Sequence, residues 1–311
     1  MGRLHSTVAA AACGAVGGCL YLAVTLGKPG ALIFAYLTQL PLFLAGLWLG
    51  TGAAALAGLA GSLVLLAASD LLGAVVFAGL NAAPVTLLVR QALLARRHAD
   101  GTLTWYPAGL LAAWLTAIAL AGIAAAMLLF GGPQGLQAAL HDVVGDVLDR
   151  LARRPLPNRE EVAAVLATVI PGTVAASWMV MAVVNAVLAQ GVLARFGANW
   201  RPTPDIAGLG LPLWLPLALG LAAGATVLGG TARLVGVNVI IALSVPFCLA
   251  GLAVLHAFAR RLRNPAMALV GFYLMGGLFG WPFFVIAIVG LLETWLGLRH
   301  RLAPHGASID G

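Results

Sequence analysis

Ionisable side chains within apolar segments are the first candidates for chemistry, because charged groups are costly in hydrocarbon and usually functional there. This sequence has few of them. Asp70 precedes an apolar run, where a helix N-cap is expected, and it is also a candidate for an ion pair or a proton relay. Glu293 is a candidate for the same two roles, with Arg260 as an expected partner, and His256 lies close to that arginine in the sequence.

Uncharged polar side chains form a second set of candidates. In lipid these groups need hydrogen-bond partners, so we expect them to face the interior of a helix bundle. Two interpretations follow: a cavity that binds a small molecule, or hydrogen bonds between helices with no cavity, which is the expectation for any single residue. The candidate ligand-binding residues are Tyr36, Gln39, Asn81, Trp178 and Asn185.

Motifs for a metal, a cofactor or an enzyme are not found in the sequence. Cys13, Cys19 and Cys248 lie in apolar segments without a CxxC pattern or a paired histidine, so they are interpreted as buried apolar residues. HExxH, P-loop and dinucleotide-binding patterns are missing. We therefore expect no cofactor, no metal and no enzymatic activity. The alternative, an enzyme that acts on lipids, requires Glu293 and His256 to converge at one membrane interface.

Composition identifies the elements that would position these residues. The chain has 311 residues, of which 62% are hydrophobic and 9% charged, against roughly 25% charged in soluble domains. Its charges gather in short stretches between long apolar runs, which are the candidate membrane spans. The net charge of +7 does not indicate nucleic-acid binding, because the arginines flank apolar segments instead of forming a continuous basic surface.

The apolar runs predict an all-α, polytopic transmembrane helical bundle. A spanning helix needs about 20 apolar residues, and the expected count is about ten spans, within a range of eight to ten. The break at residues 280–282 separates the last two, of which 266–279 is short enough to be re-entrant. The expected spans are 6–26, 31–49, 53–69, 71–94, 105–130, 163–193, 211–228, 234–256, 266–279 and 282–298.

Arginine placement predicts the orientation of these spans. Cytoplasmic loops collect Lys and Arg, and every second loop is arginine-rich if both termini are cytoplasmic. Arg accounts for all but one of the 17 basic residues, which together with abundant Ala and Gly indicates a bacterial protein. We therefore expect a multi-pass protein of the bacterial inner membrane. The arginines that set this orientation are Arg90, Arg96, Arg97, Arg195, Arg201, Arg260, Arg261, Arg263, Arg299 and Arg301.

One long polar segment divides the chain. Its apolar residues recur at helical spacing, which predicts an amphipathic helix on the external interface, with Asp149 and Arg153 as an i,i+4 pair. The run 158–161 is a capping box that starts the next span. The predicted domains are a first bundle at 1–131, the external helix at 132–160, a second bundle at 161–298 and a cytoplasmic tail at 299–311.

Two stretches resemble a known family. The closing run Gly290-Leu-Leu-Glu-Thr-Trp-Leu-Gly-Leu-Arg299 and the run Pro41-Leu-Phe-Leu-Ala-Gly-Leu47 are similar to the YybS-like bacterial membrane proteins, which carry a domain of unknown function. That family is usually grouped with the substrate-binding S-components of energy-coupling-factor transporters. The resemblance implies docking onto a transmembrane partner through small residues of the first helix, where Ala11 and Ala15 have the matching spacing.

Two functions follow as hypotheses. The first is a transporter component that binds an unidentified small molecule within the bilayer and works with a transmembrane partner or a separate ATPase module. The alternative is a non-transporting scaffold or regulator that acts through contacts between helices. A polar cavity near the five candidate residues would favour the first hypothesis, and pairing among these groups without a cavity would favour the second.

Overall fold

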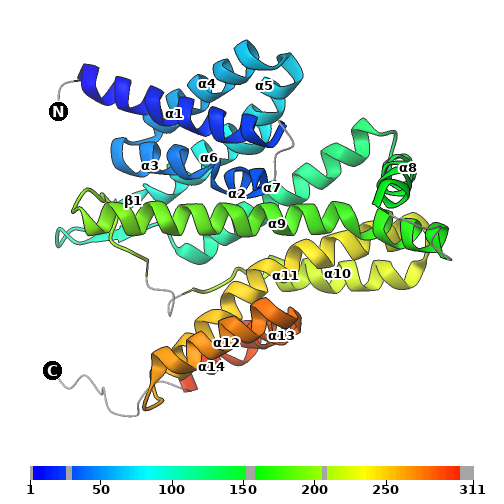
Figure 1. The fold of residues 1–311 in the computed structure, drawn as a ribbon. Coiled ribbons are helices and arrows are strands. Elements are labelled where there is room, and N and C mark those ends of the chain that lie inside the picture. The colour runs from blue at the N-terminus through cyan, green and yellow to red at the C-terminus, as the bar shows by residue number, and fades with distance from the viewer. Residues whose placement is uncertain (1–2, 26–29, 152–157, 205–208, 302–311) are drawn as a thin grey trace. The chain divides into compact units, whose positions relative to one another are not determined.

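The fold is helical apart from one short hairpin (Figure 1). A computed structural model describes residues 3–25, 30–151, 158–204 and 209–301. The elements are α1 (Arg3–Thr25), α2 (Ala31–Leu37), α3 (Leu40–Leu49), α4 (Thr51–Ala68), α5 (Leu71–Phe77), the π-helix η1 (Ala78–Ala82), α6 (Ala83–Ala92), β1 (Ala95–Arg97), β2 (Leu103–Trp105), α7 (Ala108–Leu129), α8 (Pro133–Leu151), α9 (Arg159–Arg195), α10 (Trp214–Leu228), α11 (Gly230–Ala259), α12 (Pro265–Phe279), α13 (Trp281–Leu296) and α14 (Leu298–Arg301).

Among the described residues, six helical segments are long and apolar enough to cross a membrane. They are Leu4–Ala23, Thr51–Ala68, Leu71–Ala92, Ala108–Leu129, Arg159–Arg195 and Gly230–Ala259. A seventh span results if α12 and α13 are counted together. The polytopic helical architecture is therefore confirmed, whereas the expected count of about ten spans is not.

Length and breaks explain the lower count. All ten predicted apolar runs are helical, but Ile33–Leu49 and Trp214–Leu228 are shorter than the other spans. A helix of 15 residues rises only about 22 Å, less than the hydrocarbon thickness of roughly 30 Å. Helices α12 and α13 meet at an angle of 117°. The break falls at Gly280, whose φ of 72° favours glycine, followed by Pro282 in the first turn of α13.

The chain forms two compact units. The first comprises Met1–Leu115 and Trp178–Pro204, and the second comprises Thr116–Ser177 and Asp205–Gly311. Helices α7 and α9 therefore each contribute to both units. This division differs from the predicted boundaries at residues 131 and 161, because side chains in the second half of α9 bond to elements of the first unit.

Close contact between α1 and α4 builds the first unit. Glycine allows two helix backbones to approach, since a Cβ atom at Gly14 would meet the carbonyl oxygen of Ala57, and one at Gly18 would lie 2.8 Å from the carbonyl oxygen of Gly61. Beside this contact, the ring of Phe77 is fully buried and meets Tyr21 edge to face, with 5.6 Å between ring centroids. Gly14 and Gly18 of the first helix thus serve packing within the chain.

The second unit has a comparable contact between α11 and α13. A Cβ atom at Gly290 would meet the carbonyl oxygen of Phe247, and one at Gly251 would meet that of Ile286. Helix α10 also lies against α11, where a Cβ atom at Gly236 would be 2.6 Å from the carbonyl oxygen of Ala222. Backbone contact at these glycines holds the three helices together.

Helix α8 confirms that the polar segment contains a helix. Its Leu136 and Val144 are buried, whereas Val143 is 59% exposed. Helix α9 begins at Arg159, as the capping-box pattern predicted. Arg153, the expected partner of Asp149, lies outside the described residues, as does most of the predicted 299–311 tail.

The antiparallel hairpin β1–β2 was not predicted. It joins α6 to α7, and its register pairs Ala95 with Trp105, Arg96 with Thr104 and Arg97 with Leu103. Its turn contains Asp100-Gly101, with Gly101 at φ 84°, and residues 102–105 alternate polar and apolar side chains. Both are hairpin signals, but the segment was interpreted only as an arginine-bearing loop between two spans.

Candidate functional site

Three elements of the first unit converge on one backbone carbonyl. The Leu80 oxygen accepts a 3.4 Å hydrogen bond from Nε2 of Gln39 and a 2.8 Å hydrogen bond from Nε1 of Trp178. Leu80 lies in the π-helix η1, between α5 and α6. π-helical turns often occur at functional sites. These two hydrogen bonds join Gln39, which lies between α2 and α3, and Trp178 of α9 to η1.

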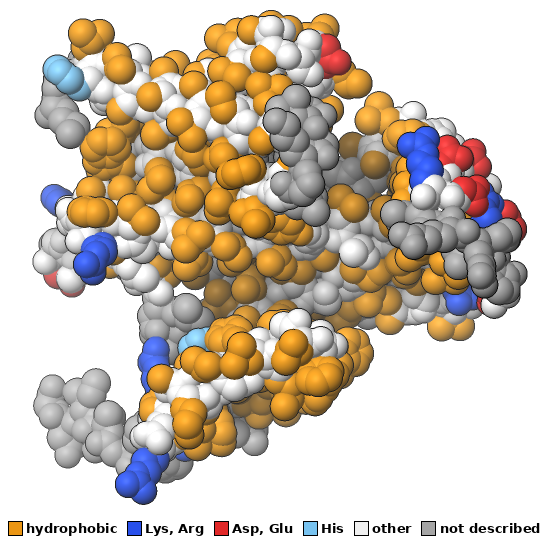
Figure 2. Space-filling model, viewed as in Figure 1, with side chains coloured by type: hydrophobic (Ala, Val, Ile, Leu, Met, Phe, Trp, Pro, Cys, Tyr) orange, Lys and Arg blue, Asp and Glu red, His pale blue; other side chains and the backbone are white. Residues whose placement is uncertain are grey.

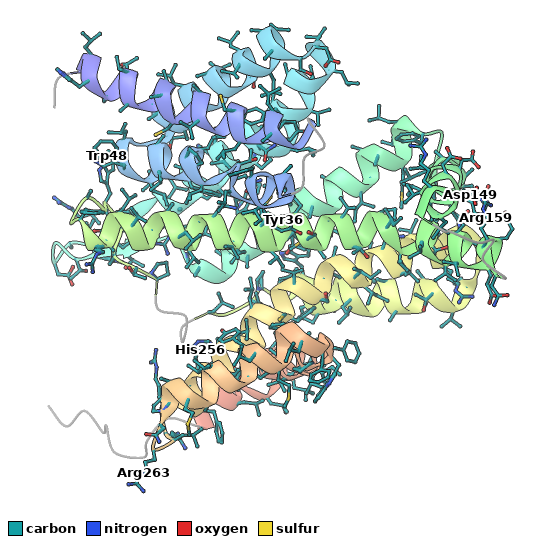
Figure 3. All side chains as sticks on the ribbon, viewed as in Figure 1. Tyr36, Trp48, Asp149, Arg159, His256 and Arg263 are labelled. Carbon is teal, nitrogen blue, oxygen red and sulfur yellow. The ribbon has the colours of Figure 1, made fainter. Side chains whose placement is uncertain are left out.

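Asn185 lies two helical turns beyond Trp178 on α9 and also bonds to the first unit's backbone. Its Nδ2 donates to the carbonyl oxygens of Tyr36, at 2.5 Å, and Met181, at 2.7 Å. The Asn185 side chain is fully buried. Tyr36, labelled on α2 in Figure 3, contributes its backbone carbonyl here, while its side chain is 47% exposed.

Two buried oxygens in this region lack a hydrogen-bond donor. They are Oε1 of Gln39 and Oδ1 of Asn185, and both residues have 0% exposure. A buried acceptor without a donor is unfavourable by about 1–3 kcal/mol. We call the group formed by Tyr36, Gln39, Leu80, Trp178 and Asn185 the amide junction. Both oxygens are able to accept a hydrogen bond, but neither the pocket at the hairpin β1–β2 nor the groove on α1 is lined by a residue of the amide junction.

Local sequence accounts for the position of Gln39. Helix α2 ends at Leu37, and Thr38 turns its hydroxyl back to the Phe34 carbonyl at 3.2 Å. Pro41 then occupies the first turn of α3, where a proline does not remove a helical hydrogen bond. Gln39 therefore sits at a helix break and not on a continuous helical face. Asn81, the fifth predicted ligand-binding residue, is buried in η1 beside Leu80.

A second polar centre lies within the second unit. Asn238 of α11 accepts a 2.6 Å hydrogen bond from the Gly172 amide and donates to the carbonyl oxygens of Thr168, at 2.9 Å, and Leu234, at 2.8 Å. Gly172 follows Pro171, the proline inside α9. Asn238 thus bonds to both backbone groups that flank the proline-interrupted turn. From the sequence, Asn238 is one of the uncharged polar residues expected to need a hydrogen-bond partner in lipid, but an asparagine in an apolar run does not reveal which partner.

Glu293 is paired with Arg299 and not with Arg260, which corrects the expected partner. Its Oε1 accepts from Nε of Arg299 at 2.7 Å, and its Oε2 accepts from the Arg299 backbone amide at 3.1 Å. Gly297, with φ 55° and ψ 45°, ends α13 and reverses the chain so that Arg299 folds back. Arg299 also donates from Nη2 to the Leu209 carbonyl at 2.8 Å. Glu293 and Arg299 are six residues apart, and this spacing does not predict a side-chain contact on a continuous helix.

Asp70 and His256 both have local partners. Asp70 caps α5, since its Oδ1 accepts a 2.6 Å hydrogen bond from the Gly73 amide. Nδ1 of His256 lies 2.8 Å from the Leu252 carbonyl oxygen, and its ring lies 6.1 Å from that of Tyr273. Among the described ion pairs, Glu293 is bonded to Arg299 and not to His256.

A charged cluster joins α8 to the start of α9 (Figure 3). Arg159 donates to both carboxylate oxygens of Asp149, at 2.7 and 2.8 Å, and also contacts Glu160. Nε2 of His141 lies 3.4 Å from Oε2 of Glu160. The hydrogen bond from Arg159 lowers the pKa of Asp149, and the same bond raises the pKa of Arg159. Acidic and basic groups gather here against a largely hydrophobic visible surface (Figure 2).

Arg201 has a role that the sequence analysis missed. It was interpreted as an orientation signal, but it is 6% exposed. Its guanidinium donates to the carbonyl oxygens of Ala92, at 3.0 Å, and Tyr106, at 2.8 Å, on either side of the hairpin. Burial lowers its pKa. Its own carbonyl accepts from Gln190 of α9 at 2.8 Å.

The predicted docking residues lie beside an apolar groove. Ala11 and Ala15 are half-buried on α1, and Ala15 lines the groove with Val16, Cys19 and Phe34. Across the described residues, no group of three or more His, Cys, Asp or Glu side chains is arranged to hold a metal ion.

Comparison with known proteins identifies the family. A family described as Predicted membrane protein (DUF2232) matches residues 19–294. The chain belongs to this family. The resemblance to a bacterial membrane-protein family of unknown function is therefore confirmed, whereas the similarity to S-components of energy-coupling-factor transporters stays a prediction. The description of the DUF2232 family names a membrane protein without an activity. No curated protein and no solved structure matches the chain.

The closing motif of the family resemblance has a structural explanation. Gly290 allows contact with the α11 backbone, Glu293 bonds Arg299, and Gly297 supplies the left-handed turn between them. These three properties occupy one ten-residue run. In this chain the motif closes the end of α13.

Proposed function

We propose that this DUF2232 protein is a small-molecule-binding component of a transport system in the bacterial inner membrane, with its ligand at the amide junction. The observation that carries the proposal is the pair of buried oxygens, Gln39 Oε1 and Asn185 Oδ1, without donors. Broken helices that surround polar groups are typical of transporter binding sites. Here the α2–α3 break and η1 supply such irregular backbone.

The chemistry of the junction restricts the ligand. Its unsatisfied groups are acceptors, whereas the donors of Gln39, Trp178 and Asn185 already bond to backbone carbonyls. An anion would meet carbonyl and carboxamide oxygens and be repelled. A solute with amino or hydroxyl groups, or a cation, complements the site. Any ATP hydrolysis belongs to a separate module, and the α1 surface at Ala11 and Ala15 is the proposed contact for a transmembrane partner.

Native mass spectrometry of the full-length protein in lipid nanodiscs tests the proposal. We expect a co-purifying small molecule with the wild-type chain and its loss with Gln39→Met, which removes both the donor and the acceptor at similar side-chain volume. Gln137→Met is the matched control, because Gln137 donates to Thr168 in the second unit at 2.9 Å. It should retain the molecule. Retention by Gln39→Met, or no bound molecule in the wild type, contradicts the proposal.

A scaffold without transport activity is the second candidate function. It is favoured by the hydrogen bonds that the side chains of Gln39, Trp178 and Asn185 already donate, since these bonds tie α9 to η1 and α2 without a ligand. In the same experiment a scaffold would appear as a stoichiometric protein partner with no small molecule bound.

A further inference from the structure

A pocket of about 430 Å³, lined by both apolar and polar side chains, opens at the hairpin β1–β2. Arg96, His98 and Thr104 line it together with the aromatic residues Trp105 and Tyr106. A volume of several hundred cubic ångströms is typical of small-ligand sites. This pocket lies within the first unit and shares no lining residue with the amide junction.

Strand register places the polar side chains of the pocket on one face. Arg96 pairs with Thr104 across the hairpin, so their side chains project from the same face. His98 is two residues beyond Arg96, and its Nε2 lies 2.7 Å from Oγ1 of Thr104. Arg97 pairs with Leu103 and therefore projects from the opposite face. The side chains of Arg96 and Arg97 therefore project from opposite faces of the hairpin.

The base of the hairpin is held rigidly. Buried Arg201 donates to the Ala92 and Tyr106 carbonyls, and the Tyr106 amide donates to the Leu94 carbonyl at 2.9 Å. At the tip, Asp100 accepts hydrogen bonds from the amide and hydroxyl of Thr102. This acid, the one carboxylate of the hairpin, is thereby turned to its own loop and does not line the pocket.

Chain connectivity places the pocket at a membrane surface. The candidate span Leu71–Ala92 ends three residues before β1, and the span Ala108–Leu129 begins three residues after β2. The hairpin must therefore lie where the hydrocarbon ends and phospholipid headgroups begin. Trp and Tyr are enriched at this depth, and basic groups attract anionic lipids there.

We infer that this pocket binds the phosphate of an anionic phospholipid headgroup. The Arg96 guanidinium supplies a bidentate fork for phosphate oxygens, and the hydrogen-bonded pair of His98 and Thr104 supplies a further donor. Tyr106 is two residues beyond Thr104, on the same face of the hairpin, and lies beside the glycerol region of the lipid. The hairpin thereby anchors the first unit to anionic lipid, independently of any solute at the amide junction.

Lipid titration of the full-length protein in neutral detergent tests this inference. Phosphatidylglycerol and phosphatidylcholine are titrated in parallel, and bound lipid is counted by native mass spectrometry. We expect the wild type to prefer phosphatidylglycerol by about tenfold or more, and Arg96→Gln to weaken that binding about tenfold. Arg97→Gln is the matched control, with the same charge change on the opposite face, and should weaken binding less than about twofold. Thr104→Val should give an intermediate loss.

Soluble glycerol 3-phosphate distinguishes a lipid from a free phosphate ester. It should compete with phosphatidylglycerol only weakly, because it lacks the acyl chains that place a headgroup at the hairpin. Three results would each overturn the inference: equal losses for Arg96→Gln and Arg97→Gln, no preference for the anionic lipid in the wild type, or glycerol 3-phosphate binding as tightly as the lipid.

Discussion

Among the described hydrogen bonds of the second unit, the Asn238 side chain has the most backbone partners. We therefore expect its loss to destabilise the protein. Asn238→Leu removes its bonds to Gly172, Thr168 and Leu234 and leaves backbone groups of α9 unpaired beside Pro171. We expect a loss of about 1–2 kcal/mol in the free energy of unfolding, measured by denaturant or thermal titration in detergent. Asn264→Leu, at an exposed position without a side-chain cap bond, is the control and should change little.

The Glu293–Arg299 pair predicts a strong coupling between two residues. Both side chains are largely buried, with 5% and 15% exposure. Arg299→Gln leaves a buried carboxylate without its cation and should destabilise the protein by on the order of 3 kcal/mol. Glu293→Gln combined with Arg299→Gln should cost less than the sum of the two single changes. A double-mutant cycle of unfolding free energies measures this coupling, and simple additivity would show that the pair is not formed.

At the scale of elements, glycine contacts decide which helices can meet. Gly290→Ala places a Cβ atom against the Phe247 carbonyl and 2.6 Å from the Gly251 amide nitrogen. Backbone atoms cannot move aside as a side chain would, so we expect a loss of about 2 kcal/mol and a lower melting temperature. Gly271→Ala is the matched control on α12, where an added Cβ atom meets nothing within 4 Å. Alanine favours a helix over glycine, so this variant should melt at the same or a higher temperature.

The contact between α8 and α9 should depend on pH. The pKa of Asp149 is lowered by its bond from Arg159, so the contact is complete above the ordinary Asp pKa and is lost as the pH falls below about 4. Glu160, His141 and Asp142 also face this cluster. Hydrogen exchange of α8 amides between pH 7 and 3, corrected for intrinsic rates, should show weaker protection at the acidic end.

Asp149→Asn supplies the comparison for this pH dependence. It removes the titrating carboxylate while it keeps a similar shape, so α8 should be less protected at neutral pH and its corrected protection should change less on acidification. The interpretation fails if wild type and Asp149→Asn show the same acid transition.

For the whole molecule, the span α7 separates the hairpin from α8 in the chain. We therefore predict that these two segments lie on opposite sides of the membrane, with the hairpin cytoplasmic. In a chain whose three native cysteines are replaced by alanine, Asp142→Cys should react with an impermeant maleimide in intact cells. Asp100→Cys should react only after permeabilisation, and both positions are exposed. Labelling of both sites in intact cells would exclude α7 as a spanning helix and would contradict the predicted orientation.

Local properties of the sequence were sufficient to predict the class of fold and several local roles. Apolar run length identified the helical segments, because backbone amides in lipid must be satisfied within a helix. The break near Gly280, the start of α9 at Arg159 and the cap at Asp70 depend on residues adjacent in the chain, so they were also accessible. The five candidate polar residues were selected for the cost of an unpaired polar group in lipid, which does not require knowledge of their partners.

Tertiary structure decided everything that depends on distant residues. Only the fold places Gln39, Leu80 and Trp178 together, joins Asn238 to the backbone beside Pro171, and buries Arg201 at the base of the hairpin. The left-handed conformation of Gly297 also brings Arg299 back to Glu293. The physical reason is that hydrophobicity and helical propensity act along the chain. A hydrogen bond or a backbone contact depends instead on where two helices approach each other, and an apolar pattern shared by every span does not specify that.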